Sequence, residues 1–154
     1  MFRGRVYRAA APDDDDLARA ADRTREDPGR FNCPHFGAVY VALEPETAVA
    51  EVARNAGGKV DDCAVFVVQA DLANVVDLSD PEQRRRLSLR EQELTAENVK
   101  PCQRAAEVLY KSGVEAVIWP SAAGKGKSMA IYLDRLRQES KVEIVHSYSL
   151  PTPG

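Results

Sequence analysis

The chain has 154 residues, of which 44% are hydrophobic, 29% charged and 6% aromatic, and its formal net charge is −3. This length suits one domain that buries roughly two-thirds of the surface of its unfolded form. A negative net charge disfavours general nucleic-acid binding, because neutralising phosphates requires a basic surface. We therefore expect a single soluble domain over residues 1–154 that binds no nucleic acid directly.

Membrane insertion and secretion are not indicated. No apolar run approaches the ~18 residues that span a membrane, and the first residues lack the apolar core of a secretory signal, so we expect a cytoplasmic protein. The three cysteines, Cys33, Cys63 and Cys102, are far apart and form no CxxC pair. This indicates free thiols rather than a zinc site or a disulfide framework. Only His35 is near Cys33, so a catalytic cysteine is disfavoured.

The N-terminal part alternates like a β-strand over residues 5–9, which places Val6 and Arg8 on one face. Arg8 either points from the sheet into a pocket or faces solvent, and spacing alone favours solvent. The aspartate run at 13–16 is typical of a solvated loop or a helix start, with metal binding as a minor alternative. A short helix is expected at 17–25, within a polar segment that reads as a surface lid or loop.

A turn is predicted next, because Gly29 allows a tight turn of the backbone, and Arg30 follows it. Phe31 is the expected anchor of this turn, and Asn32 can bond to local backbone. The alternation at 39–43 then indicates a strand that is apolar on both sides, with the ring of Tyr40 buried opposite the valines.

A helix is expected to begin near Pro45 and to stop at Gly57-Gly58. Its apolar stripe is predicted at five positions: Ala48, Val49, Val52, Ala53 and Ala56. Glu51 lies beside this stripe, and helix geometry alone favours a solvated glutamate there.

Residues 64–70 form a second apolar strand, which we expect to be central to the sheet. A further apolar stretch follows at 75–78. A serine three residues ahead of Glu82 then indicates a helix start at Ser79. The arginines at 84–86 are most simply a solvated face, with a partner-binding surface as the alternative.

The last third begins with a helix opened by Pro101, in which Ala105, Val108 and Leu109 share one face. A strand at 114–119 follows, then Ser121 and a glycine-rich loop, and strands at 129–133 and 142–148. The text GKGKS is not a phosphate-binding P-loop, because that pattern requires a glycine where Ser121 stands. Lys125 and Lys127 remain possible point charges for a phosphate.

The order of these motifs is more specific than any one of them. In sequence they are Arg8 on a strand, Gly29-Arg30-Phe31-Asn32, Val39-Tyr40-Val41-Ala42, Thr47-Ala48 with Glu51, and Pro120-Ser121-Ala122. This succession resembles the RES domain family, which comprises toxins of bacterial toxin–antitoxin pairs and is named for an arginine, a glutamate and a serine. The resemblance runs from about residue 6 to residue 133, and here the three residues are Arg30, Glu51 and Ser121.

The resemblance implies an α+β fold with an ADP-ribosyltransferase-like core, in which helices surround a mainly antiparallel sheet. It also implies that the substrate is NAD, that the nicotinamide–ribose bond is cleaved by water or phosphate, and that no metal is needed. Transfer of ADP-ribose to a protein is the alternative activity. A non-catalytic nucleotide-binding or protein-interaction module is the alternative from another class.

The resemblance also implies roles for individual residues. Arg30 and Arg8 would bind the pyrophosphate of NAD, and Tyr40 would pack against nicotinamide or its ribose. Glu51 would accept hydrogen bonds from ribose hydroxyls and stabilise the ribosyl cation, while Ser121 would position the nicotinamide ribose or amide. The catalytic candidates are thus Arg30, Tyr40, Glu51 and Ser121, and the ligand-binding candidates are Arg8, Arg30, Asn32, Tyr40, Lys127 and Ser128.

The chain departs from the family pattern after the Pro-Ser motif. The family often carries an asparagine there, where this chain has Lys127-Ser128.

The implied partner is an antitoxin with an Xre-like helix-turn-helix domain, which would silence the toxin in an oligomeric complex. The arginines at 84–86 and the lysines of the loop at 124–128 are candidate docking charges for an acidic tail of that antitoxin.

Overall fold

The structure is a computed structural model that describes residues 1–55 and 62–150. Within these ranges the strands are β1 (Phe2–Ala10), β2 (Val39–Ala42), β3 (Ala64–Leu72), β4 (Val75–Asp77), β5 (Ala116–Pro120), β6 (Lys127–Ile131) and β7 (Lys141–Ser149). The α-helices are α1 (Leu17–Glu26), α2 (Pro45–Asn55), α3 (Pro81–Arg86) and α4 (Lys100–Lys111), and the 3₁₀ turns are η1 (Glu91–Leu94) and η2 (Leu133–Arg135).

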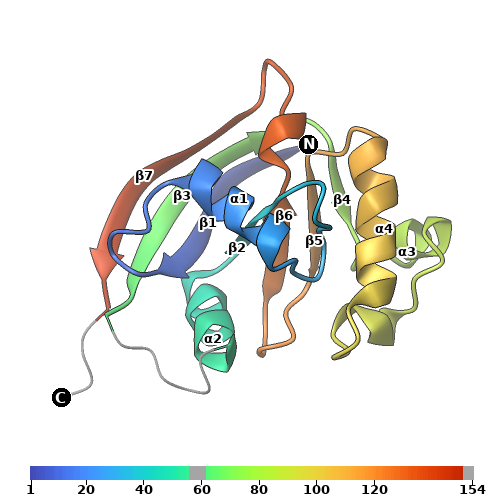
Figure 1. The fold of residues 1–154 in the computed structure, drawn as a ribbon, viewed down its shortest axis with the longest axis horizontal. Coiled ribbons are helices and arrows are strands. Elements are labelled where there is room, and N and C mark those ends of the chain that lie inside the picture. The colour runs from blue at the N-terminus through green and yellow to red at the C-terminus, as the bar shows by residue number, and fades with distance from the viewer. Residues whose placement is uncertain (56–61, 151–154) are drawn as a thin grey trace.

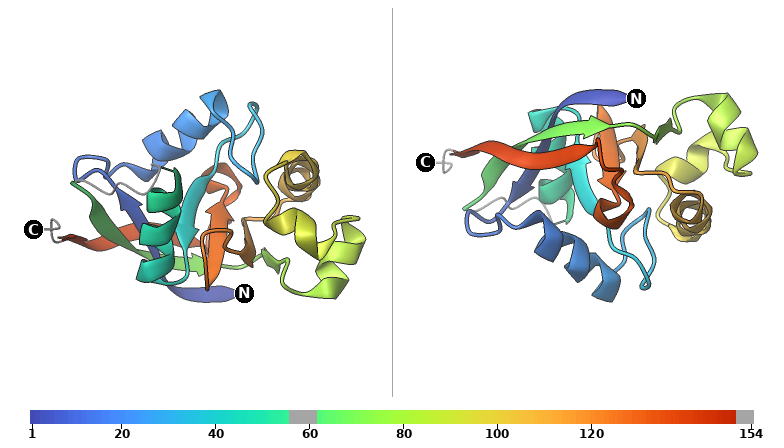
Figure 2. Two further views of the ribbon diagram at one scale, coloured as in Figure 1. Left: turned by 90° about the horizontal axis from the view of Figure 1, so that it is seen from below. Right: turned by 90° about the horizontal axis from the view of Figure 1, so that it is seen from above.

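The strands form one seven-stranded sheet in the order β4-β5-β6-β2-β1-β3-β7. Its pairs are antiparallel except for β4 and β5, which run parallel. Figure 1 shows α3 and α4 together beside β4 and β5, while α2 lies near the end of β1. The turned views of Figure 2 keep α2 well separated from the pair α3 and α4. The chain is thus a single α+β domain with a mainly antiparallel sheet, as expected.

The sheet is split between β1 and β2. These strands pair only at Tyr7 and Ala42, whereas β1 and β3 stay paired over the whole length of β1. On its other edge β2 pairs with β6 at four positions. Beyond Tyr7 the backbones of β1 and β2 no longer form a ladder, and this opens a gap inside the sheet where side chains can surround a ligand.

Strand alternation divides the core into two clusters, one on each face of the sheet. Tyr40, Trp119 and Tyr132 face the side covered by α4, where they pack with Phe31 and Phe36. The buried residues of the opposite face are Val6, Val39, Val41, Val68, Ala70, Leu72, Ala116, Ile118, Met129 and Ile131, and Ala21 of α1 packs there too. Because β2 is apolar on both sides, it lies between both clusters at the centre of the sheet.

Helix α1 begins at a side-chain N-cap. The side chain of Asp16 accepts a hydrogen bond of 3.1 Å from the backbone N–H of Arg19 and so caps the first turn. Ala20 and Ala21 are buried beneath the helix. The helix expected at 17–25 is therefore confirmed, one aspartate of the run is its cap, and the helix is packed rather than a surface lid or loop.

Several local predictions were wrong. Strand β3 lies next to the edge strand β7, and the central strand is β2. Helix α3 is capped by Asp80, which accepts from Glu82 N–H at 3.0 Å, and not by Ser79. Val108 of α4 is 54% exposed and does not share the buried face of Ala105 and Leu109. The errors about β3 and Val108 share a cause, since which strand is central and which helix face is covered depend on distant segments, whereas the cap was a choice between two adjacent residues.

The expected stop of α2 at Gly57-Gly58 lies outside the described residues. No helix in the described part of the chain is both long and apolar enough to cross a membrane.

Candidate active site at the split in the sheet

A cavity of about 750 Å³ lies at the gap between β1 and β2. Its lining includes Arg8 from β1, Arg23 from α1, Arg30 from the following turn, Tyr40 from β2 and Glu51 from α2. These residues come from five separate segments. The volume is within the range of small-molecule sites in proteins.

The carboxylate of Glu51 is held by two hydroxyl groups, one from the loop after β5 and one from β6. Ser121, directly after β5, donates a short hydrogen bond to Glu51 Oε1, and Ser128 of β6 approaches the same oxygen at 3.5 Å. Ser121 Oγ in turn accepts from the backbone N–H of Ala123 at 3.1 Å. Because the single hydroxyl proton of Ser121 goes to Glu51, this serine orients the carboxylate and leaves Oε2 for a ligand.

Helix geometry alone favoured a solvated Glu51, but in the structure its half-buried side chain lines the cavity. Ala48, Glu51, Val52 and Asn55 all line the cavity, and their spacing of three and four residues puts them on one face of α2. Val52, which we assigned to the apolar stripe of this helix, lines the cavity instead.

The loop that carries Ser121 is fastened to the first turn of α2. Thr47 is 2% exposed and donates a hydrogen bond of 3.0 Å to the carbonyl of Lys125. Gly126, with φ of 100°, passes so close that a β-carbon there would stand 2.2 Å from Thr47 Oγ1. The loop closes with a bond of 3.0 Å from Ser121 N–H to Gly126 O. Thr47 and Gly126 thereby set the place of Ser121 relative to Glu51.

Tyr40 is fixed through its hydroxyl group. This group donates to Asn32 Oδ1 at 2.7 Å and accepts from the backbone N–H of Phe31 at 3.0 Å. Burial raises the pKa of Tyr40 well above 10.0 despite the hydrogen bond from Phe31, so the phenol stays neutral. Its ring meets Trp119 edge to face, with centroids 6.1 Å apart, and both residues line the cavity.

Asn32 is fully buried and lies outside the cavity lining. Besides Tyr40, its Oδ1 accepts from Gly29 N–H at 2.7 Å, and its Nδ2 donates to the carbonyls of Thr24 and Phe36. All of these contacts are made inside the protein. In the structure Asn32 holds Tyr40 and the turn in place, and its amide does not reach the cavity.

Arg30 bridges the cavity wall to the segment before α4. Its Nη2 donates to the carbonyl of Ala96 at 2.7 Å, and its Nη1 approaches the carbonyl of Glu93 at 3.4 Å and Cys102 Sγ at 4.0 Å. A guanidinium group carries five N–H donors, so donors remain for a ligand. Part of the guanidinium group that we expected to bind phosphate nevertheless donates to backbone carbonyls.

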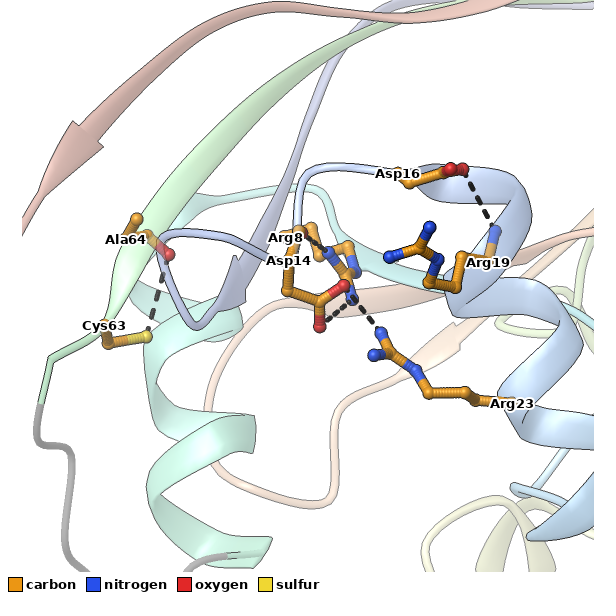
Figure 3. Close-up of polar contacts among 7 residues, drawn as sticks. All are labelled: Arg8, Asp14, Asp16, Arg19, Arg23, Cys63 and Ala64. Atoms are coloured by element: carbon orange, nitrogen blue, oxygen red, sulfur yellow. Dashed lines mark hydrogen bonds and ion pairs between the residues drawn. The ribbon is translucent and has the colours of Figure 1, made fainter.

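Arg8 and Arg23 converge on one carboxylate (Figure 3). Arg8 Nη2 lies 2.8 Å from Asp14 Oδ2, and Arg23 Nη2 lies 2.6 Å from Asp14 Oδ1. Arg8 Nη1 also donates to the backbone carbonyl of Asp14 at 2.6 Å. Burial raises the pKa of Asp14, but the hydrogen bonds and charges of both arginines outweigh it and hold this pKa below its usual value. The expectation that Arg8 faces solvent is wrong, since its side chain is 11% exposed.

Lys127 lies apart from this group. Its Nζ pairs with Asp77 Oδ2 at 3.1 Å across β5, and neither residue lines the cavity. Ser128, its neighbour, faces the cavity because adjacent strand residues point to opposite sides. Among the described residues no three His, Cys, Asp or Glu side chains come together as a metal site.

The structure thus brings Arg8, Arg30, Tyr40, Glu51 and Ser128 to one cavity, with Ser121 directly behind Glu51. Sequence reasoning missed Arg23, Trp119 and Gly126, and it named Thr47 only as part of a family motif. Two of these residues carried a signal, since Trp119 lies two residues from buried Val117 on the same face of its strand and Arg23 follows Ala20 at helix spacing. No local pattern predicted the contact between Thr47 and Gly126.

The fold and the cavity define an α+β protein whose polar groups meet where two strands of its sheet separate. The family model described as RES domain matches residues 5–152, so the chain belongs to the RES domain family. A chain in the crystal structure of the M. tuberculosis MbcT-MbcA toxin-antitoxin complex has a similar fold, with a TM-score of 0.79 and 23% identity. That match covers 97% of this chain and 85% of the other. No curated protein sequence matches the chain significantly.

Proposed function

We propose that this protein is the toxin of a toxin–antitoxin pair and that it cleaves the nicotinamide–ribose bond of NAD, depleting NAD in the cytoplasm. Membership of the RES domain family supports the class of protein. The observation that carries the chemistry is the carboxylate of Glu51, oriented by Ser121 at the wall of a cavity whose lining also includes Tyr40, Trp119, Arg8, Arg23 and Arg30.

Cleavage of this bond passes through a ribosyl cation that resembles an oxocarbenium ion. A fixed negative charge beside the forming cation lowers the barrier because it needs no reorganisation during the reaction. Glu51 fits this role, since hydrogen bonds to Oε1 hold the carboxylate and Oε2 remains for the ribose. Ser121 and Ser128 then act through Glu51 as positioning residues.

The aromatic pair supplies a place for nicotinamide. Tyr40 and Trp119 meet edge to face, and a planar cationic ring is attracted to the faces of such rings. Because the hydroxyl of Tyr40 is engaged by Phe31 and Asn32, we assign packing to its ring and no proton transfer to its phenol.

The arginines supply the contacts to phosphate. Arg8 and Arg30 both line the cavity together with Tyr40, and a guanidinium group can bind two phosphate oxygens at once. A ligand that spans from the arginines to Glu51 would present an anionic group to the arginines and hydroxyl donors to the carboxylate. NAD, with its pyrophosphate and ribose, has both.

The partner follows from the same family. The solved chain of similar fold was crystallised in a toxin–antitoxin complex. We propose that an antitoxin, with an Xre-like helix-turn-helix domain, binds this chain and closes the cavity. Helix α3, with the arginines at 84–86, lies away from α2 (Figure 1), so an antitoxin using both that helix and the cavity mouth would have to extend along the molecule.

The test is NAD turnover by purified protein, measured as nicotinamide release with and without phosphate. Wild-type protein is expected to release nicotinamide. Glu51→Gln keeps the size of the side chain but removes its charge, and should lower kcat roughly 10²–10³-fold while NAD still binds.

Glu46→Gln is the matched control, because Glu46 is exposed in the first turn of the same helix. Turnover of Glu51→Gln within threefold of wild type would remove the carboxylate from the chemistry. Mass spectrometry of added proteins distinguishes the acceptors: attached ADP-ribose indicates transfer to protein, and free products indicate water or phosphate.

A further inference from the structure

We propose that Arg23 forms, with Arg8, a two-arginine subsite for the phosphates of the ligand, and that Asp14 is the residue that positions both guanidinium groups toward the cavity. The aspartate run had no function in the sequence analysis, and Arg23 was not recognised there as part of the site. The identity of the ligand as NAD rests on the proposed function, whereas the phosphate subsite itself does not.

The geometry supports a subsite. Arg8 and Arg23 both line the cavity, and Asp14 does not, so the carboxylate stands behind the guanidinium groups. Its two oxygens each take a separate arginine, at 2.8 and 2.6 Å. Figure 3 shows the two side chains reaching the carboxylate from different elements, Arg8 from β1 and Arg23 from α1.

The donor count leaves room for a ligand. Asp14 uses Nη1 and Nη2 of Arg8 and Nη2 of Arg23, whereas each guanidinium group carries five N–H donors. Two positive charges face one negative charge, so the group keeps a surplus of one positive charge. A phosphate or pyrophosphate group in the cavity would neutralise this surplus.

Asp14 also explains how Arg23 is kept ready. The Arg23 side chain is 52% exposed, and a free arginine at a surface loses conformational entropy when a ligand immobilises it. The ion pair with Asp14 orders this side chain before binding. The side chain of Asp14 is 19% exposed. Its backbone is held at both groups, since the carbonyl accepts from Arg8 Nη1 and the N–H donates to the carbonyl of Ala11, so the carboxylate is fixed in place.

The experiment measures binding of ADP-ribose, which contains a pyrophosphate and lacks the bond to be cleaved, by calorimetry. Arg23→Gln should bind it about tenfold more weakly than wild type, a loss equivalent to 1.4 kcal/mol. Adenosine, which has no phosphate, should bind both proteins equally. Arg25→Gln is the control, because Arg25 is an exposed arginine of the same helix whose Nε donates to Pro34 O outside the cavity. Equal ADP-ribose affinity in wild type and Arg23→Gln, or no binding by wild type, would overturn the subsite.

The positioning role of Asp14 has its own comparison. Asp14→Asn should weaken ADP-ribose binding several-fold, Asp14→Glu should restore part of it, and Asp13→Asn should leave it unchanged. Tighter binding by Asp14→Asn would show that Asp14 competes with the ligand, which contradicts positioning. If Asp14→Asn does not fold, Arg23→Gln still decides the subsite, since Arg23 is at the surface of α1.

Turnover separates this inference from the proposed function. NAD cleavage with an unchanged KM in Arg23→Gln would leave the function standing and remove the subsite. ADP-ribose binding that depends on Arg23, without any NAD cleavage by wild type, would do the opposite. If both are correct, Arg23→Gln raises KM for NAD about tenfold and changes kcat little.

Discussion

Gly126 lies directly against Thr47, and a β-carbon at residue 126 would stand 2.2 Å from Thr47 Oγ1. This contact fastens the loop of Ser121 to the helix of Glu51, because Thr47 and Glu51 are one turn apart on α2. The position of Ser121 relative to the carboxylate of Glu51 therefore depends on a glycine that contacts Thr47 of the helix and accepts a hydrogen bond from Ser121 N–H.

Gly126→Ala should lower both stability and turnover. The added methyl group overlaps Thr47, and φ of 100° is strained for alanine, so we expect a loss of about 2 kcal/mol in the free energy of unfolding and a clear fall in kcat. Gly124→Ala is the control, since its φ is also positive but a β-carbon there meets nothing within 4 Å. Equal urea unfolding curves for the two variants would refute a role for the Thr47 contact.

Arg30→Lys should weaken NAD turnover and also destabilise the fold. Arg30 donates to the carbonyls of Glu93 and Ala96, and an ammonium group cannot reproduce the planar guanidinium geometry. We expect a loss of about 1–3 kcal/mol in unfolding free energy. Arg85→Lys, at an exposed ion pair with Glu82, is the control and should change neither quantity. Full stability together with reduced turnover would show that the bonds of Arg30 to backbone carbonyls do not support the fold.

Tyr40→Phe should lower stability more than activity. Removing the hydroxyl leaves the buried N–H of Phe31 without its acceptor, which costs about 1–3 kcal/mol, while the ring that faces the cavity remains. Tyr148→Phe, at a tyrosine that is 40% exposed, is the comparison. A hundredfold loss of kcat in a stable Tyr40→Phe variant would instead assign the phenol to the chemistry.

Asp14 should make the protein sensitive to acid. Hydrogen bonds and charges of Arg23 and Arg8 outweigh the effect of burial and lower its folded-state pKa below the usual 3.8. A lowered pKa stabilises the fold fully above pH 3.8, and this contribution is lost as the pH falls through the folded-state pKa. The difference in unfolding free energy between wild type and Asp14→Asn should therefore be constant near neutral pH and shrink below about pH 4. A difference that does not change with pH would mean that the charge of Asp14 contributes nothing.

Local sequence patterns were sufficient for the elements and for the family. Alternation located the strand of Tyr40, a continuous apolar run located the strand of Phe66, proline marked helix starts near Pro45 and Pro101, and the order of short motifs identified the RES domain. These features depend on neighbours in the chain, which the sequence displays directly. Most of the site candidates also came from this order of motifs.

The tertiary structure decided how those elements are used. Only the strand order places β2 at the centre and opens the gap beside β1, and only that gap turns Glu51 from a surface position into a cavity position. Arg30 bonds to carbonyls 63 and 66 residues away, and Thr47 meets a loop 78 residues away. Such contacts are determined by which distant segments pack together, and no periodicity within a segment records its partner.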